Sequence, residues 1–114
     1  MTTRLPDAQQ HLERLVGATV HTIAGERPNA IIAIEGDKVL VGTEKSPGGQ
    51  HVEIAWIQEA IDRLKAEGEL EVTTAALGAP IGHRSALIGA VLREIEGVRV
   101  VSHHPARVAL ETRT

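Results

Sequence analysis

The sequence predicts a single α+β domain, and three observations carry this prediction. The chain has 114 residues, a length that suits one domain. Its composition is that of a folded protein, but Trp56 is the only Phe, Trp or Tyr, so the core must be built from aliphatic side chains. Apolar residues recur at helical spacing in some segments and gather in short Ile- and Val-rich runs in others, which predicts both helices and strands.

The N-terminal part is expected to hold one helix and one β-hairpin. Apolar residues at helical spacing predict a helix over residues 7–16, which Gly17 ends. Residues 18–29 are expected to be irregular or weakly extended. Two Ile- and Val-rich strands are then expected on either side of the Gly36-Asp37 turn, over residues 30–35 and 38–44.

The C-terminal part is expected to hold two strong helices and three strands. The first helix, over residues 52–67, has an apolar stripe formed by Ile54, Ile57, Ala60, Ile61 and Leu64. The second helix is predicted over residues 84–96, with a stripe formed by Ile88, Val91, Leu92 and Ile95. Between them we expect a short strand at 69–72 and a single helical turn at 73–77. Strands at 98–102 and 107–111 flank a turn at 103–106.

This order of elements is that of a winged helix-turn-helix. In such a fold the second long helix packs on the first, its outer face enters a major groove of DNA, and the hairpin turn forms the wing. We therefore expect residues 51–112 to form a winged-helix core and residues 1–50 to add a helix and a β-hairpin. Both parts belong to the one domain of residues 1–114.

Four segments resemble a small bacterial domain that accompanies restriction-type, modification-dependent nucleases. They are residues 27–31, 39–49, 55–58 and 83–92, and the resemblance covers roughly residues 17–104. It implies an accessory winged-helix module that recognises double-stranded DNA, modified DNA included, beside a nuclease domain in the same chain or in a partner. The 114 residues themselves contain no nuclease motif.

Charge is distributed unevenly along the chain. Residues 1–79 contain seven Lys and Arg against twelve Asp and Glu, a net charge of −5, whereas residues 80–114 contain five Arg and three Glu, a net charge of +2. A polyanion such as DNA is therefore expected to meet the C-terminal third. Chance variation in a short segment is the alternative reading of this bias.

The candidate DNA-binding residues lie on the second predicted helix and around the wing. On the outer face of the helix these are His83, Ala86, Gly89 and Arg93, and the small side chain of Ala90 is expected on the same face. Gly89 in mid-helix costs about 1 kcal/mol relative to Ala, which indicates that something approaches the backbone closely. A DNA groove is one candidate, and another helix, from residues 7–16 or from a partner subunit in a homodimer, is the other.

Six further residues carry alternatives of their own. Arg84 and Ser85 in the first helical turn suit a phosphate group, although Arg84 could instead form a structural salt bridge. His103, His104 and Arg107 surround the wing tip, where side chains contact phosphate or the minor groove, or simply face solvent. Trp56 is expected to anchor the core, with base reading as the alternative.

Several function classes are excluded or disfavoured by the residues present. The chain has no cysteine, no phosphate-binding loop motif and no clustered catalytic side chains, so we expect a non-catalytic domain without cofactor or metal. No apolar run approaches the roughly 20 residues of a membrane span, and the N-terminus has no signal-peptide core, which indicates a cytoplasmic protein without a membrane partner. A protein-interaction or dimerisation module without DNA binding is the rival interpretation.

Overall fold

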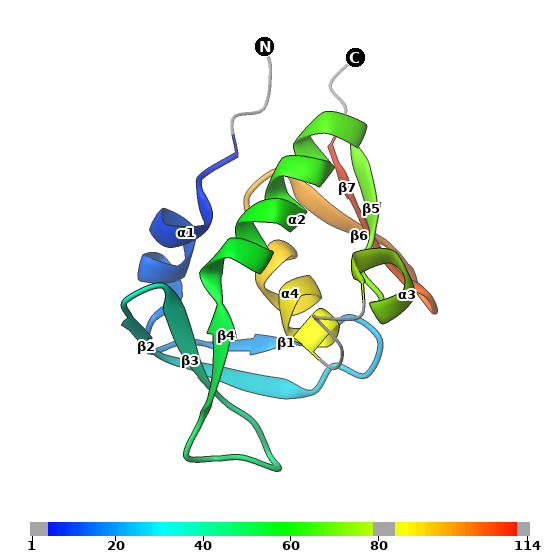
Figure 1. Ribbon diagram of the computed structural model, residues 1–114. Coiled ribbons are helices and arrows are strands. Elements are labelled where there is room, and N and C mark those ends of the chain that lie inside the picture. The colour runs from blue at the N-terminus through cyan, green and yellow to red at the C-terminus, as the bar shows by residue number, and fades with distance from the viewer. Residues whose placement is uncertain (1–4, 79–83, 112–114) are drawn as a thin grey trace.

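The computed structural model describes residues 5–78 and 84–111, which form an α+β domain with two antiparallel sheets (Figure 1). The elements, in chain order, are α1 (Ala8–Leu15), β1 (Thr19–His21), β2 (Pro28–Glu35), β3 (Lys38–Gly42), β4 (Gln50–Glu53), α2 (Ile54–Glu67), β5 (Glu69–Glu71), α3 (Thr74–Leu77), α4 (Ser85–Leu92), β6 (Val98–His103) and β7 (Ala106–Leu110). The strands are arranged as β1-β2-β3-β4 in one sheet and as β5-β7-β6 in the other.

The first sheet contains the predicted hairpin and two strands that the sequence did not predict. The hairpin of β2 and β3 turns at Gly36 and Asp37, with Glu35 opposite Lys38, which confirms that prediction. β1 lies within the segment expected to be irregular or weakly extended, and Thr19 pairs with Ala30 of β2. β4 begins between the predicted hairpin and the predicted helix, and it replaces the first two residues expected in that helix. It pairs with β3.

The second half follows the predicted order of elements. The five stripe residues of α2 are all buried, and the helix ends at Gly68, whose φ of 79° lies in the left-handed region that glycine tolerates. β6 and β7 flank a turn at His104 and Pro105, close to where a turn was expected. α4 is shorter than the predicted helix, because after Arg93 the backbone hydrogen bonds span three residues instead of four, from Glu94 to Val91 and from Ile95 to Leu92.

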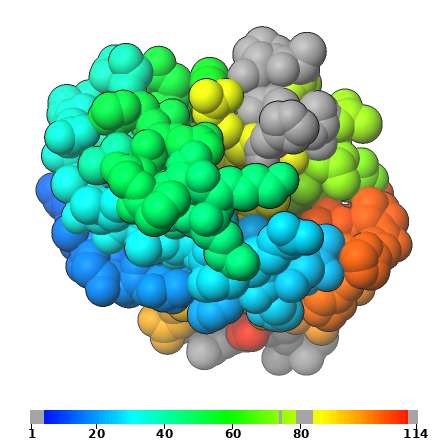
Figure 2. Space-filling view, turned by 90° about the horizontal axis from the view of Figure 1, so that it is seen from below, coloured from blue at the N-terminus to red at the C-terminus, as the bar shows by residue number. Residues whose placement is uncertain are grey.

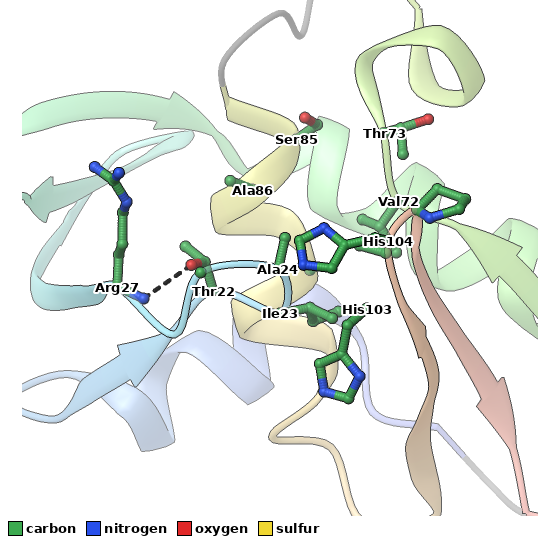
Figure 3. A pocket seen from close by; sticks show the side chains of 14 residues that line it. Thr22, Ile23, Ala24, Arg27, Val72, Thr73, Ser85, Ala86, His103 and His104 are labelled. Carbon is green, nitrogen blue, oxygen red and sulfur yellow. Dashed lines mark hydrogen bonds between the residues drawn. The ribbon is translucent and has the colours of Figure 1, made fainter.

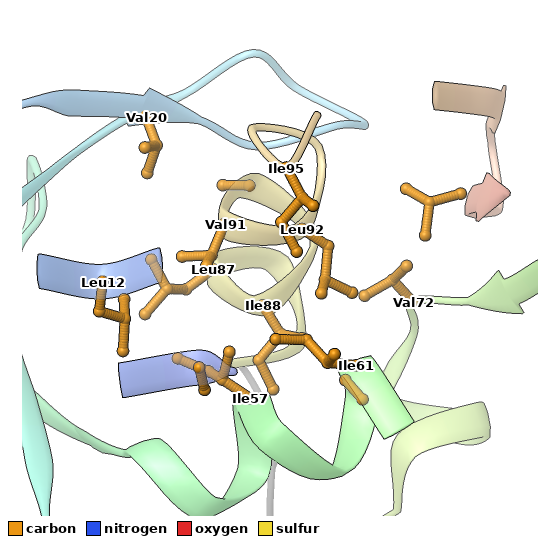
Figure 4. Packing of buried hydrophobic residues seen from close by; sticks show 14 of the residues in the cluster. Leu12, Val20, Ile57, Ile61, Val72, Leu87, Ile88, Val91, Leu92 and Ile95 are labelled. Carbon is orange, nitrogen blue, oxygen red and sulfur yellow. The ribbon is translucent and has the colours of Figure 1, made fainter. Parts of the chain in front are cut away.

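α4 lies at the centre of the core and is covered on nearly every side (Figure 4). It packs against α2, β1 and β7, and Val91 accepts a hydrogen bond at 2.8 Å from His11 Nε2 of α1. Ala86 is the one exposed residue between Ser85 and Leu92. A helix that is apolar all round is a buried helix rather than a surface one.

Candidate nucleic-acid interface

A pocket of about 450 Å³ lies where four segments meet: the β1–β2 loop (residues 22–27), residues 72 and 73 after β5, α4 and the β6–β7 turn (Figure 3). We call the surface around this pocket the loop face; it comprises residues 22–27, Ser85, Ala86 and residues 103–106. The pocket is lined by Thr22, Ile23, Ala24, Gly25, Arg27, Val72, Thr73, Ser85, Ala86, Gly89, His103, His104, Pro105 and Ala106. In Figure 2 the β1–β2 loop and the β6–β7 turn are side by side on one face of the molecule.

The described lining of the pocket contains basic side chains and no acidic one. Arg27, His103 and His104 are its ionisable residues, and all three are exposed. This is unusual in a chain whose formal net charge is −3. Glu26 also belongs to the loop face but is paired with Arg93, whereas Arg27 has no ion pair among the described residues, so an anionic ligand is favoured at Arg27.

The β1–β2 loop is held in place by hydrogen bonds of its own. The backbone N–H of Arg27 donates to Thr22 Oγ1 at 3.0 Å, and the Thr22 N–H donates to the Arg27 carbonyl at 3.0 Å. The Arg93 guanidinium donates from α4's end to the carbonyls of His21 and Thr22, and it forms an ion pair with Glu26 at 3.0 Å. These contacts fix the loop over α4.

The outer face of α4 is therefore covered, and the expectation that it is open to a DNA groove is wrong for Gly89 and Ala90. Ile23 of the β1–β2 loop is 2% exposed, and a Cβ on Gly89 would lie 3.1 Å from its Cδ1 atom. Ala90 is fully buried. Another group does lie close to the backbone of Gly89, as its mid-helix position indicated. That group is Ile23 of the β1–β2 loop, and neither DNA nor a second helix is involved.

The structure brings together five of the nine predicted site residues. Ser85, Ala86, Gly89, His103 and His104 all line the pocket, although they come from α4 and from the β6–β7 hairpin. His83 lies outside the described residues.

The three predicted arginines are engaged within the domain instead of projecting from it. Arg93 bonds the β1–β2 loop, as described above. Arg107 forms ion pairs with Glu69 and Glu71 across β5 and β7, so it is not the free phosphate contact that the sequence suggested. Arg84 lies over the Trp56 ring, 5.5 Å from its centre, and its buried Nε has no hydrogen-bond partner among the described residues.

Sequence reasoning missed the contribution of the β1–β2 loop, namely Ile23 and Arg27. Ile23 lies between Thr22 and Ala24 in a segment without regular apolar spacing, so no periodicity marks it as buried. Arg27 precedes Pro28 and suggested only a turn. A charge count could have singled out Arg27, because it is the one Lys or Arg between residues 15 and 37.

Other kinds of site find no support in the described part of the chain. There, no three His, Asp or Glu side chains converge as a metal ion would require. No helix within residues 5–78 and 84–111 is long and apolar enough to cross a bilayer. Comparisons with protein families, with curated proteins and with solved structures found no match to this chain.

Proposed function

We propose that this chain is a non-catalytic winged-helix domain that binds double-stranded DNA through its loop face. The observation that carries the proposal is the pocket with Arg27, His103 and His104 and without a carboxylate in its described lining. Nucleic-acid affinity depends mainly on positive groups that meet phosphates; Arg27 supplies such a group, and the two histidines add hydrogen-bonding rings at the same surface.

The arrangement of the second half supports the winged-helix part of the proposal. The order α2, β5, α3, α4, β6, β7, with β7 between β5 and β6, is the order of a helix-turn-helix followed by a wing. On that reading, His104 and Pro105 form the wing tip and α4 occupies the place of the recognition helix. Because the outer face of α4 is covered, DNA would meet its start, the wing tip and the β1–β2 loop.

The direct test is a fluorescence polarisation titration with labelled duplexes at two salt concentrations. Unmodified and methylated duplexes are both included, since the resemblance to accessory domains of modification-dependent nucleases implies modified DNA. We expect affinity to fall as salt rises, with a shallow log–log slope of about two to four, because each phosphate contact contributes about 0.9.

Two matched variants separate the loop face from the rest of the surface. Arg27→Ala removes an exposed cation from the pocket rim, and we expect it to weaken binding about three- to tenfold and to lower the salt slope by about one. Lys65→Ala removes an exposed cation from the last turn of α2 and should leave binding unchanged. The absence of binding to every duplex at about 50 mM salt would overturn the proposal in favour of a protein-interaction module.

A further inference from the structure

We propose that acidification strengthens DNA binding at the loop face, because His103 and His104 take up protons when phosphates approach the β6–β7 turn. This inference rests on the proposed function, since it names the regulation of the same surface. Arg27 is the permanent cation of that surface, and the two histidines supply further positive charge only when they are protonated.

The two histidines form a pair of titratable groups beside Arg27. They are consecutive in the chain, both are exposed, and both line the pocket that Arg27 also lines. Figure 3 shows the two rings on the side of the β6–β7 turn that faces the β1–β2 loop, with Arg27 further along that loop. Histidine is the side chain whose charge ordinarily changes between about pH 5 and pH 8. The charge of this surface therefore depends on pH within that range.

No partner inside the described part of the chain engages either ring. Neither the His103 ring nor the His104 ring forms a hydrogen bond or an ion pair with another described residue. Other histidines of the chain differ in this respect, because His51 Nε2 lies 2.6 Å from Glu35 Oε1 and His11 Nε2 donates to a backbone carbonyl in the core. The two rings of the turn are thus available to a ligand.

The charged groups around the turn leave a protonated ring without a free carboxylate. From the β1–β2 loop, Arg27 opposes protonation, and Glu26 is paired with Arg93. α4 has no charged residue within its bounds. Both glutamates of β5 pair with the arginine of β7, and β6 adds one more arginine; these residues are Glu69, Glu71, Arg107 and Arg99. A phosphate of bound DNA would supply the anion that the described surroundings of the rings lack.

Proton uptake and DNA binding are then linked. A negative charge within about 4–6 Å of an imidazole favours its protonated form, so phosphates that reach the turn draw protons from solvent onto the rings. Binding that takes up protons becomes stronger as the pH falls, by at most about tenfold per pH unit for each proton. The phosphodiester groups of DNA keep their charge over this range, so the change arises in the protein.

The experiment is a polarisation titration of one duplex at about pH 7.5 and about pH 5.5, each at two salt concentrations. Circular dichroism at both pH values checks that the domain is folded. We expect affinity to be about tenfold higher at the lower pH and the salt slope to steepen by about two, because each new phosphate contact adds about 0.9. Calorimetry near pH 6.5, in two buffers with different heats of ionisation, should show an uptake of about one to two protons per complex.

A matched pair of variants locates the protons. His104→Gln removes one titratable ring from the turn, and His51→Gln removes one from an exposed position of β4 that does not line the pocket. The pH effect should fall to about threefold in His104→Gln, since one of two rings remains, and stay at about tenfold in His51→Gln. The double variant His103→Gln/His104→Gln should bind DNA equally at both pH values and keep the affinity of the parent chain at the higher one.

The outcomes distinguish this inference from the proposed function. Affinity that does not change with pH, or a pH effect that persists in the double variant, overturns the role of the histidines while DNA binding through the loop face stands. Equal losses in His104→Gln and His51→Gln also overturn it, because only the net charge of the chain would then matter. No binding at either pH overturns both proposals. A pH effect that is lost in the double variant and kept in His51→Gln supports the inference.

Discussion

Replacing Ala90 by Glu tests whether the outer face of α4 is buried. Ala90 is fully buried, so the larger side chain must displace its neighbours, which costs about 1–3 kcal/mol. Its carboxyl group also loses hydration without a prepared partner, which costs about 1–3 kcal/mol even when the group is neutral. We therefore expect Ala90→Glu to lower the free energy of unfolding by about 3–5 kcal/mol, a large part of the stability of a domain this size.

The matched control is Ala86→Glu, which places the same side chain at the exposed position of the same helix. It should change stability by no more than about 0.5 kcal/mol. Thermal denaturation followed by circular dichroism measures both, with a shift of about 10–20 °C expected for Ala90→Glu and almost none for Ala86→Glu. If the two variants melted at the same temperature as the parent chain, the outer face of α4 would be open to solvent, and the β1–β2 loop would not cover it.

Three further predictions concern contacts that hold the core and the loop face. Arg93→Ala removes the hydrogen bonds to the β1–β2 loop and the ion pair with Glu26, so chemical denaturation should show a loss of about 1–2 kcal/mol; an unchanged midpoint would show that the loop is held without Arg93. Burial lowers the pKa of His11 below its ordinary value of 6.5, as does the nearby Arg14, and these outweigh the Val91 carbonyl and Glu94, which raise it. The unfolded chain therefore binds more protons than the folded chain, so the contribution of His11 to the free energy of unfolding is complete above about pH 6.5 and is lost as the pH falls below that value. His11→Leu should flatten the resulting decline in melting temperature between pH 7 and pH 5. Trp56→Ala should cost about 2 kcal/mol rather than the 3–5 kcal/mol expected for a fully buried ring, because Trp56 is only partly buried, and a melting temperature equal to the parent's would contradict this.

The helices and hairpins that carry strong periodicity were predictable, and the reason is local. The apolar stripe of α2 has helical spacing over about three turns, and every stripe residue is buried. The Gly36-Asp37 turn sits between two Ile- and Val-rich runs, which fixes the hairpin without help from the rest of the chain. In each case the residues that predict the element are the same residues that form it.

The cover over α4 was not predictable in the same way, because it is a contact between distant segments. Ile23 and Gly89 are 66 positions apart, and neither belongs to a periodic stripe that would join them. Small residues at positions 86, 89 and 90 are equally suited to a DNA groove and to protein packing. The sequence of α4 did hold one usable signal, since Ser85–Leu92 has no charged residue on any face, which is typical of a buried helix.

The sequence predicts a basic C-terminal third, but only the structure shows which of its charges are paired within the domain. The C-terminal third has a net charge of +2, but Arg93 and Arg107 are paired with glutamates from earlier in the chain, so that charge does not appear as a basic surface. The unpaired positive charge of the loop face is that of Arg27, in the half whose net charge is negative, because Glu26 in the same loop is paired with Arg93. With so few cations, nonspecific attraction to phosphate is weak. Any tight binding must then come from short-range contacts at the loop face, and a weak salt dependence of DNA binding is what this arrangement predicts.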